Sequence, residues 1–220
     1  MPLIAGCGSA DTKAACTLTA DAVACGADAL LVITPYCNKG TADGILEHYR
    51  RVADAACGRP VILYNIPSRT GVDLTEAQYA ALAEIPHICA VKEASGSMAK
   101  LTRLCADGRL AVYSGNDDQI LPVMAVGGRG VISVLSNLAP AAVSAMTHAA
   151  ADGDFATARH LAYKYARLIS LLFAETNPAP LKYALELLGL CRGEVRLPLA
   201  EVGDDLKAAL RGELTALGML

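Results

Sequence analysis

The sequence predicts an α/β fold built on a parallel sheet. Two observations indicate it: short apolar runs recur along the chain, and each is followed by a turn containing Gly or Pro and then by an amphipathic helix. Runs without polar alternation are typical of strands buried on both faces. The six expected strands are Leu3–Ala5, Ala29–Ile33, Val61–Tyr64, Ile88–Val91, Leu110–Tyr113 and Val131–Leu135.

The segments between these strands carry signals for the start and end of helices. Thr41 precedes a segment whose apolar residues share one face, and this helix is expected to end near Gly58. Thr75 and Gln78 have the spacing of a capping box. A later helix is expected to end at Gly108, just before the next strand. Right-handed crossovers would place the carboxyl ends of all the strands at one edge of the sheet.

From Ala139 onward the pattern becomes all-helical. We expect one domain, in which residues 1–138 form the strand–helix part and residues 139–220 form a helical region packed on it, because no linker separates them. The expected helices are Ala141–Ala151, Phe155–Phe173, Pro180–Leu188 and Asp204–Leu217.

Composition excludes several classes of protein. The 220 residues carry a net charge of -3 with no basic stripe, so a nucleic-acid partner is not expected. None of the 8 cysteines forms C-x-x-C, and none of the 4 histidines has metal-ligand spacing; buried, reduced thiols and no metal site are expected. Neither a signal peptide nor an apolar run of about 18 residues is present, so we expect a cytoplasmic protein without membrane spans.

The candidate functional residues directly follow the strands. Lys92 extends an apolar strand at the expected edge. A lysine amine among apolar groups has its charged form disfavoured, and a neutral amine attacks ketones to form an imine. The competing interpretation is an ordinary strand-end lysine that reaches water, and position alone favours it.

Tyr64 and Arg69 have the same two interpretations. A tyrosine in a strand is commonly a packed aromatic, but its phenol could relay protons beside an imine. A loop arginine is commonly solvated, but its guanidinium could bind a substrate carboxylate through two hydrogen bonds. Spacing does not choose between them.

Seven motifs, taken together, favour the functional interpretation of these residues. They are I-A-G-C-G (4–8), I-T-P-Y-C-N (33–38), L-Y-N-I-P-S-R-T-G (63–71), V-K-E-A-S-G (91–96), S-G-N-D (114–117), G-G-R-G-V-I-S (127–133) and R-L-P (196–198). In this order and across nearly the whole chain, they resemble the dihydrodipicolinate synthase (4-hydroxy-tetrahydrodipicolinate synthase) family of class I aldolase-type (β/α)8 TIM barrels.

The resemblance implies a role for each matching residue. Lys92 would form the imine with pyruvate, Tyr64 would shuttle protons, and Arg69 would hold the carboxylate of aspartate semialdehyde. Three further residues would line the substrate pocket: Gly115, Asn116 and Ile132. The lysine is itself the electron sink, so no metal or organic cofactor is implied.

The implied activity is that of a lyase which condenses pyruvate with L-aspartate 4-semialdehyde on the route to diaminopimelate and lysine. The implied assembly is a homotetramer built as a dimer of dimers. The alternative on the same scaffold is an N-acetylneuraminate lyase-like enzyme or a 2-keto-3-deoxy sugar-acid aldolase. These enzymes as a rule lack the arginine of P-S-R-T-G, so Arg69 favours the synthase. A third alternative is a barrel fragment without catalytic activity.

The sequence departs from the family pattern in two places. Only six of the eight strand–helix units are present, and they correspond to strands 3–8 of the barrel. The family's T-T-G-E motif, which lies in one of the missing units, is absent. We therefore expect an N-terminally truncated chain that folds poorly alone and has impaired activity. Where the family often has T-P-Y-Y-N, this sequence has T-P-Y-C-N at residues 34–38. Tyr36 is kept at the expected dimer interface, and Cys37 replaces a tyrosine that reaches the active site of the neighbouring subunit.

Overall fold

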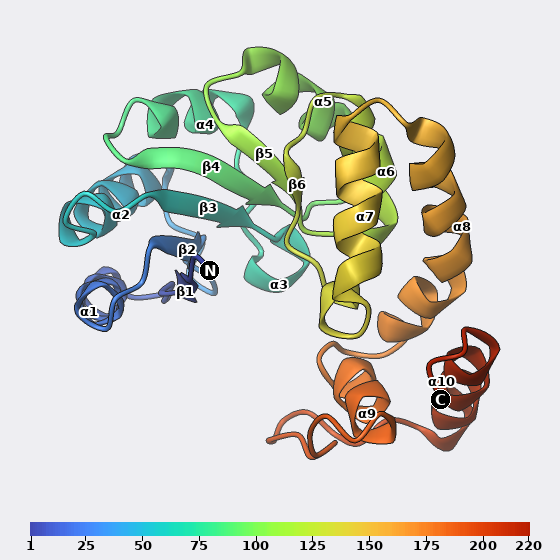
Figure 1. Ribbon diagram of the computed structural model, residues 1–220. Coiled ribbons are helices and arrows are strands. Elements are labelled where there is room, and N and C mark those ends of the chain that lie inside the picture. The colour runs from blue at the N-terminus through green and yellow to red at the C-terminus, as the bar shows by residue number, and fades with distance from the viewer. The chain divides into compact units, whose positions relative to one another are not determined.

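The computed structural model describes residues 1–220 and contains one six-stranded sheet. All five neighbouring pairs are parallel, and the strands lie in sequence order across the sheet (Figure 1). The strands are β1 (Ile4–Gly6), β2 (Ala29–Ile33), β3 (Val61–Asn65), β4 (Ile88–Glu93), β5 (Ala111–Ser114) and β6 (Gly130–Val131). The parallel α/β prediction is therefore confirmed.

Ten α-helices and two short 3₁₀ helices connect and follow the strands. The α-helices are α1 (Thr12–Ala24), α2 (Ala42–Ala55), α3 (Pro67–Thr70), α4 (Glu76–Ala83), α5 (Met98–Asp107), α6 (Ile120–Ala125), α7 (Pro140–Ala151), α8 (Phe155–Leu172), α9 (Ala179–Leu187) and α10 (Asp204–Ala216). The 3₁₀ helices are η1 (Asp117–Gln119) and η2 (Leu135–Asn137). None of these helices has the length and apolar character that crossing a bilayer requires.

The first of two compact units contains the whole sheet and comprises residues 1–115 and 125–132. Helices α2, α4 and α5 lie along one face of its strands (Figure 1). The strand residues Leu30, Val32, Leu63 and Val91 are completely buried, as expected for a parallel sheet covered by helices.

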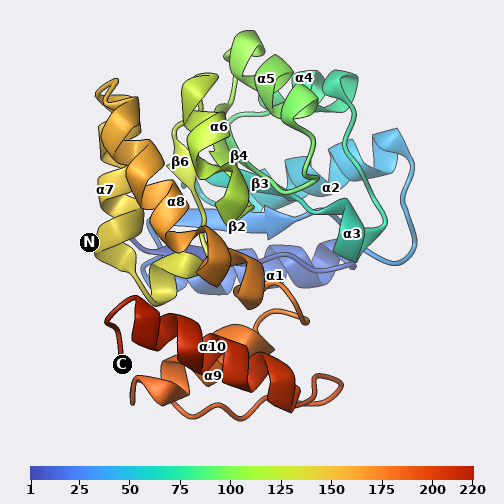
Figure 2. The same ribbon diagram turned by 90° about the vertical axis from the view of Figure 1, so that its right-hand side faces the viewer.

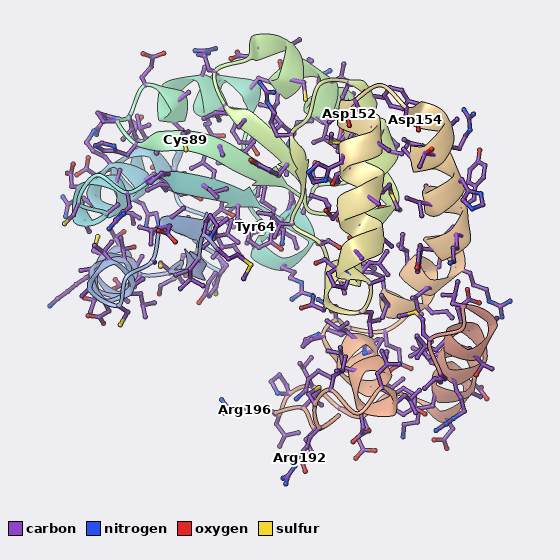
Figure 3. All side chains as sticks on the ribbon, in the orientation of Figure 1. Tyr64, Cys89, Asp152, Asp154, Arg192 and Arg196 are labelled. Carbon is purple, nitrogen blue, oxygen red and sulfur yellow. The ribbon has the colours of Figure 1, made fainter.

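The second unit, residues 116–124 and 133–220, is helical. Helices α7 and α8 lie side by side, and α10 lies along α9 (Figures 1 and 2). Leu168, Leu172 and Leu210 are fully buried in this unit. Asp152 and Asp154 mark the turn between α7 and α8 (Figure 3), where the Asp154 carboxylate caps α8 by accepting a hydrogen bond from the Thr157 amide at 3.0 Å.

The predicted helix signals are confirmed by cap geometry. The Thr41 side chain caps α2, and Thr75 and Gln78 form a reciprocal capping box at the start of α4. Helix α5 ends at Gly108, which has a left-handed φ of 74° and bonds back to the Leu104 carbonyl. The four predicted C-terminal helices are also present within one residue at each end.

The expected strand over residues 131–135 is wrong beyond Val131. Only Gly130 and Val131 pair with β5, at Tyr113 and Ser114. Further along, the amides of Val134 and Leu135 donate to one oxygen of the Asp117 carboxylate, at 3.0 and 2.9 Å. These bonds take the backbone away from sheet pairing and into the start of η2. The apolar sequence did not reveal this competing acceptor.

The prediction of buried cysteines is wrong for most of them, although all eight are free. Cys7 is buried, two cysteines are half-buried and five are exposed. Several of the exposed cysteines occupy turns: Cys25 caps the end of α1, and Cys37 and Cys57 have positive φ values of 74° and 49°. Chain reversal therefore places them at the surface despite their apolar neighbours.

Candidate active site

Tyr64 and Lys92 lie side by side where β3 and β4 end. The register of this parallel pair aligns Tyr64 with Lys92, and the next residues, Asn65 with Glu93. Tyr64 lies near the start of α3 (Figure 3). The edge expected from the chain pattern therefore brings together the two residues that were predicted to cooperate.

The Lys92 amine lies over the phenol ring of Tyr64. Its Nζ is 4.2 Å from the ring centroid, and both side chains are half-buried. An ammonium over an aromatic face is attracted by the ring quadrupole. The ring therefore limits where the amine can point while leaving it partly accessible.

A glycine faces the Lys92 side chain from the end of β5. A Cβ atom added to Gly115 would lie 3.2 Å from Lys92 Cε and 2.5 Å from the Ala94 Cβ. The Gly115 amide donates to the Glu93 carbonyl at 2.8 Å, which fixes this close approach. Gly115 is thus the residue that leaves room for the lysine.

Ile132 lies at the same edge, directly after β6. Its amide donates to the Ser114 carbonyl at 2.9 Å, and this continues the β5–β6 ladder past the last paired residue. The side chain of Ile132 is half-buried. The structure therefore places Gly115 and Ile132 at the ends of adjacent strands.

Arg69 belongs to the short helix α3, directly after β3. This turn is fixed by Thr70, whose hydroxyl contacts the carbonyls of Ile66 and Val72 at 3.1 and 3.0 Å. It ends at Gly71, whose φ of 71° is left-handed. Arg69 is an exposed residue.

Burial and Arg69 act in opposite directions on the phenol of Tyr64. Burial raises the pKa of Tyr64, because the charged phenolate is poorly solvated, and the positive charge of Arg69 lowers it. Burial is the larger effect, so the phenol keeps its proton near neutral pH. A protonated phenol beside an amine can donate a hydrogen bond or pass a proton.

The three remaining predicted residues belong to other segments of the chain. Asn116 begins the second unit, where its Nδ2 donates to Gln119 Oε1 at 3.2 Å. Tyr36 and Cys37 are exposed in the loop after β2, and 41% of the Tyr36 surface is accessible. The loop turns sharply there, since Cys37 has a positive φ and the Asn38 amide donates to the Tyr36 carbonyl at 3.0 Å.

The sequence analysis missed a polar cluster next to the candidate site. Asn65 and Glu93 directly follow Tyr64 and Lys92 and are completely buried, and the hydroxyl of Tyr79 on α4 donates to Glu93 at 2.5 Å. Polar residues at the end of two apolar strands were a usable signal, because each must find partners when buried. No group of three or more His, Cys, Asp or Glu is placed to hold a metal ion.

Comparison with known proteins gives one consistent family. The model of the dihydrodipicolinate synthetase family matches residues 1–217. A 4-hydroxy-tetrahydrodipicolinate synthase from Methanothrix thermoacetophila is 46% identical over 223 residues, which cover 100% of this chain and 75% of the relative.

Solved structures agree with the sequence comparison. A dihydrodipicolinate synthase crystal structure has a TM-score of 0.97 at 43% identity, covering 100% of this chain and 76% of the other. The dihydrodipicolinate synthase of Acinetobacter baumannii in complex with pyruvate has a TM-score of 0.96 at 41% identity, with the same coverage of 100% and 76%. The six parallel strands therefore have the arrangement found in these TIM-barrel enzymes.

Proposed function

The chain belongs to the dihydrodipicolinate synthetase family, and we propose that it condenses pyruvate with L-aspartate 4-semialdehyde through an imine on Lys92. The product is 4-hydroxy-tetrahydrodipicolinate, an intermediate of diaminopimelate and lysine biosynthesis. Two findings support the substrates: the name of the Methanothrix relative and the pyruvate bound to the Acinetobacter enzyme.

The proposed chemistry begins at the Lys92 nitrogen. The neutral amine attacks the ketone carbon of pyruvate, and the ketone oxygen leaves as water once it has gained two protons. Loss of a methyl proton then gives an enamine, since the protonated imine accepts the electron pair. The enamine carbon attacks the aldehyde carbon, and release from Lys92 with ring closure ends the cycle. Lys92 supplies the electron sink, so the scheme requires no cofactor.

Tyr64 and Arg69 have distinct roles in this scheme. The Tyr64 ring lies 4.2 Å from the amine, which supports a role in carrying protons to and from the reacting oxygen. Arg69 is accessible and its charge acts on Tyr64, which supports binding of the aldehyde's carboxylate next to the phenol. Gly115 and Ile132 line the pocket in this proposal.

The observation that carries the proposal is the position of one amine. Lys92 is half-buried at the carboxyl end of a parallel strand, with its Nζ over the Tyr64 ring and Gly115 leaving space beside its side chain. Carboxyl ends of parallel strands hold the catalytic residues in barrel enzymes. An ordinary surface lysine needs neither the aromatic face nor the glycine.

Borohydride trapping with pyruvate tests the imine directly. Reduction of the imine fixes pyruvate to the protein, and peptide mass mapping is expected to locate the adduct at Lys92. Lys92→Arg keeps a positive charge but cannot form an imine, so it is expected to give no adduct. Lys13→Arg, at an exposed position on α1, is the matched control and is expected to label fully. An unlabelled parent chain would overturn the proposal and favour a non-catalytic barrel fragment.

The choice of aldehyde separates the synthase from sugar-acid aldolases. Once labelling is established, turnover of aspartate semialdehyde and not of sugar-derived aldehydes is expected. Arg69→Lys is expected to raise KM for the semialdehyde more than it changes labelling by pyruvate, because only the aldehyde carboxylate meets the guanidinium. Preference for a sugar-derived aldehyde would instead support an N-acetylneuraminate lyase-like or 2-keto-3-deoxy sugar-acid aldolase.

We further propose that the protein is cytoplasmic and forms a homotetramer made of dimers, with Tyr36 and Cys37 at the dimer interface. Eight free cysteines suit a reducing compartment, and the loop with these two residues is exposed, as a contact surface must be. Light scattering of the parent chain and of Tyr36→Asp tests this assembly. A smaller assembly is expected for the variant; equal masses would count against an interface at this loop.

A further inference from the structure

The carboxylate of Glu93 is the centre of a buried hydrogen-bond cluster. It is completely buried and accepts four hydrogen bonds: from Asn65 Nδ2 to each oxygen at 3.1 Å, from the Tyr79 hydroxyl at 2.5 Å and from the Ser95 amide at 2.7 Å. In each of these contacts the partner group donates and a carboxylate oxygen of Glu93 accepts. Glu93 therefore depends on Asn65, Tyr79 and Ser95 for its solvation.

This cluster lies one residue beyond the candidate catalytic pair. Tyr64 is aligned with Lys92, and Asn65 with Glu93, in the same β3–β4 ladder. Successive side chains of a strand point to opposite faces, so the cluster lies on the other face of the sheet, against α4. A slip of one residue would break the cluster and turn Lys92 away from its place, so the cluster specifies the register.

The cluster also reaches the segment that carries Arg69. Asn65 Oδ1 accepts a hydrogen bond from the Leu74 amide at 3.1 Å, and its Nδ2 donates to Asp73 at 2.9 Å. Lys100 on α5 forms an ion pair with Asp73 and donates to the Leu74 carbonyl at 3.0 Å. The loop of residues 66–74, which contains Arg69, therefore begins directly after Asn65 and is held at its other end by the Asn65 side chain.

Tyr79 is the link between this cluster and the helix layer. Burial, followed by the neighbouring carboxylate of Glu93, raises the pKa of Tyr79, so its hydroxyl keeps its proton and remains a donor. Glu93 Oε2 accepts hydrogen bonds from Tyr79 and from the shared Asn65 amide. Removing the Tyr79 hydroxyl would leave a buried negative charge short of its shortest hydrogen bond.

We propose that Asn65, Tyr79 and Glu93 act as a positioning cluster for the active site. They fix the Lys92 strand end and the Arg69 segment from the face opposite the substrate. The inference rests on the proposed function, because the cluster is assigned through the residues it positions. None of the three touches the reacting atoms in this arrangement, so their effect is on geometry. If the cluster were purely structural, disrupting it would lower the stability of the protein without slowing imine formation at Lys92.

Tyr79→Phe is the test variant, and Tyr49→Phe is its matched control. Tyr49 is also completely buried, and its hydroxyl donates to a strand carbonyl, that of Val32, at 3.1 Å. Both variants lose one buried hydrogen bond, and Tyr79→Phe is expected to lose more stability in urea unfolding than Tyr49→Phe, because its hydroxyl donates to a carboxylate rather than to a backbone carbonyl. Only Tyr79→Phe is expected to slow borohydride trapping at saturating pyruvate, by about tenfold or more, because small displacements of reacting groups are costly.

A double-mutant cycle tests whether Tyr79 acts through Glu93. Glu93→Gln keeps the shape of the side chain but turns one acceptor into a donor. If the two residues act as one unit, Tyr79→Phe has a smaller effect on the trapping rate in the Glu93→Gln background than in the parent chain. Effects that multiply independently would contradict the cluster.

A measurement without substrate keeps this inference separate from the proposed function. Hydrogen exchange at the amides of Ser95 and Leu74, measured relative to other amides of the sheet, is expected to accelerate in Tyr79→Phe and not in Tyr49→Phe. Equal exchange in both variants, or equal trapping rates, would overturn the positioning role. An unlabelled parent chain would overturn the proposed function instead, and exchange would still decide whether the cluster holds the two segments.

Discussion

Gly115 and Lys92 occupy one confined space: a Cβ atom at position 115 would lie 3.2 Å from Lys92 Cε. The same atom would lie 2.5 Å from the Ala94 Cβ and 3.2 Å from its Cα, so the backbone that follows β4 also blocks it. The lysine side chain can therefore lie against β5 only because position 115 lacks a side chain.

Gly115→Ala is accordingly expected to destabilise the protein and to impair imine formation. Overpacking of this kind costs about 1–3 kcal/mol, and the flexible lysine is the group that can move most easily. Urea unfolding and pyruvate trapping measure the two effects. Gly6→Ala is the control, because nothing lies within 4 Å of its added Cβ. Normal trapping in Gly115→Ala would show that Lys92 does not need this space.

Removal of the Arg69 charge is expected to raise the pKa of Tyr64 further. Burial already raises this pKa, and the positive charge of Arg69 opposes the rise, so Arg69→Gln leaves burial unopposed. The tyrosinate absorbance of each protein, minus that of its Tyr64→Phe counterpart, isolates the phenol. Arg50→Gln on α2, where Arg50 pairs with Glu47, is expected to leave the titration unchanged. A Tyr64 pKa that falls in Arg69→Gln would contradict the electrostatic contact.

Stability is expected to fall in mild acid because of His48. This side chain is 2% exposed, and its Nδ1 lies 3.0 Å from the Thr12 hydroxyl. Burial lowers the pKa of His48 below 6.5, and the charge of Asp11 acts in the opposite direction with a smaller effect. The unfolded histidine therefore takes up a proton before the folded one does. The contribution of His48 to stability is therefore complete above pH 6.5, and it is lost as the pH falls toward the lowered pKa of His48 in the folded protein.

The measurement is the free energy of unfolding in urea at several pH values. His48→Gln is expected to flatten the slope just below pH 6.5, whereas His160→Gln, at an exposed position of α8, is expected to keep it. An unchanged slope in His48→Gln would assign the acid sensitivity to other groups.

A matched pair of leucines tests the packing of α5 on the sheet. Leu101 is completely buried, so Leu101→Ala is expected to cost about 2–5 kcal/mol of unfolding free energy. Leu197 is 91% exposed, so Leu197→Ala is expected to change stability by no more than about 0.5 kcal/mol. Equal effects of the two substitutions in urea unfolding would contradict the burial of Leu101 on the inner face of α5.

The strands show where sequence patterns suffice and where they do not. The run from Ala29 to Ile33 has the predicted bounds, because a short apolar run flanked by turn residues fits a buried strand of a parallel sheet. The run after Gly130 was equally apolar, yet only two residues pair. The Asp117 carboxylate takes the amides of Val134 and Leu135, and a side chain distant in sequence leaves no periodic signal.

The amino-acid sequence by itself determined the parallel fold, the helix ends and the identities of Tyr64, Arg69 and Lys92 as candidate residues, because periodicity, capping and local motifs are properties of neighbouring residues. Only the tertiary structure decided which partners meet: Tyr64 beside Lys92, Gly115 against the lysine, and Tyr79 on Glu93. These contacts join different strands and helices. Their formation depends on register and close packing, which act through space and are not encoded in any single stretch of the chain.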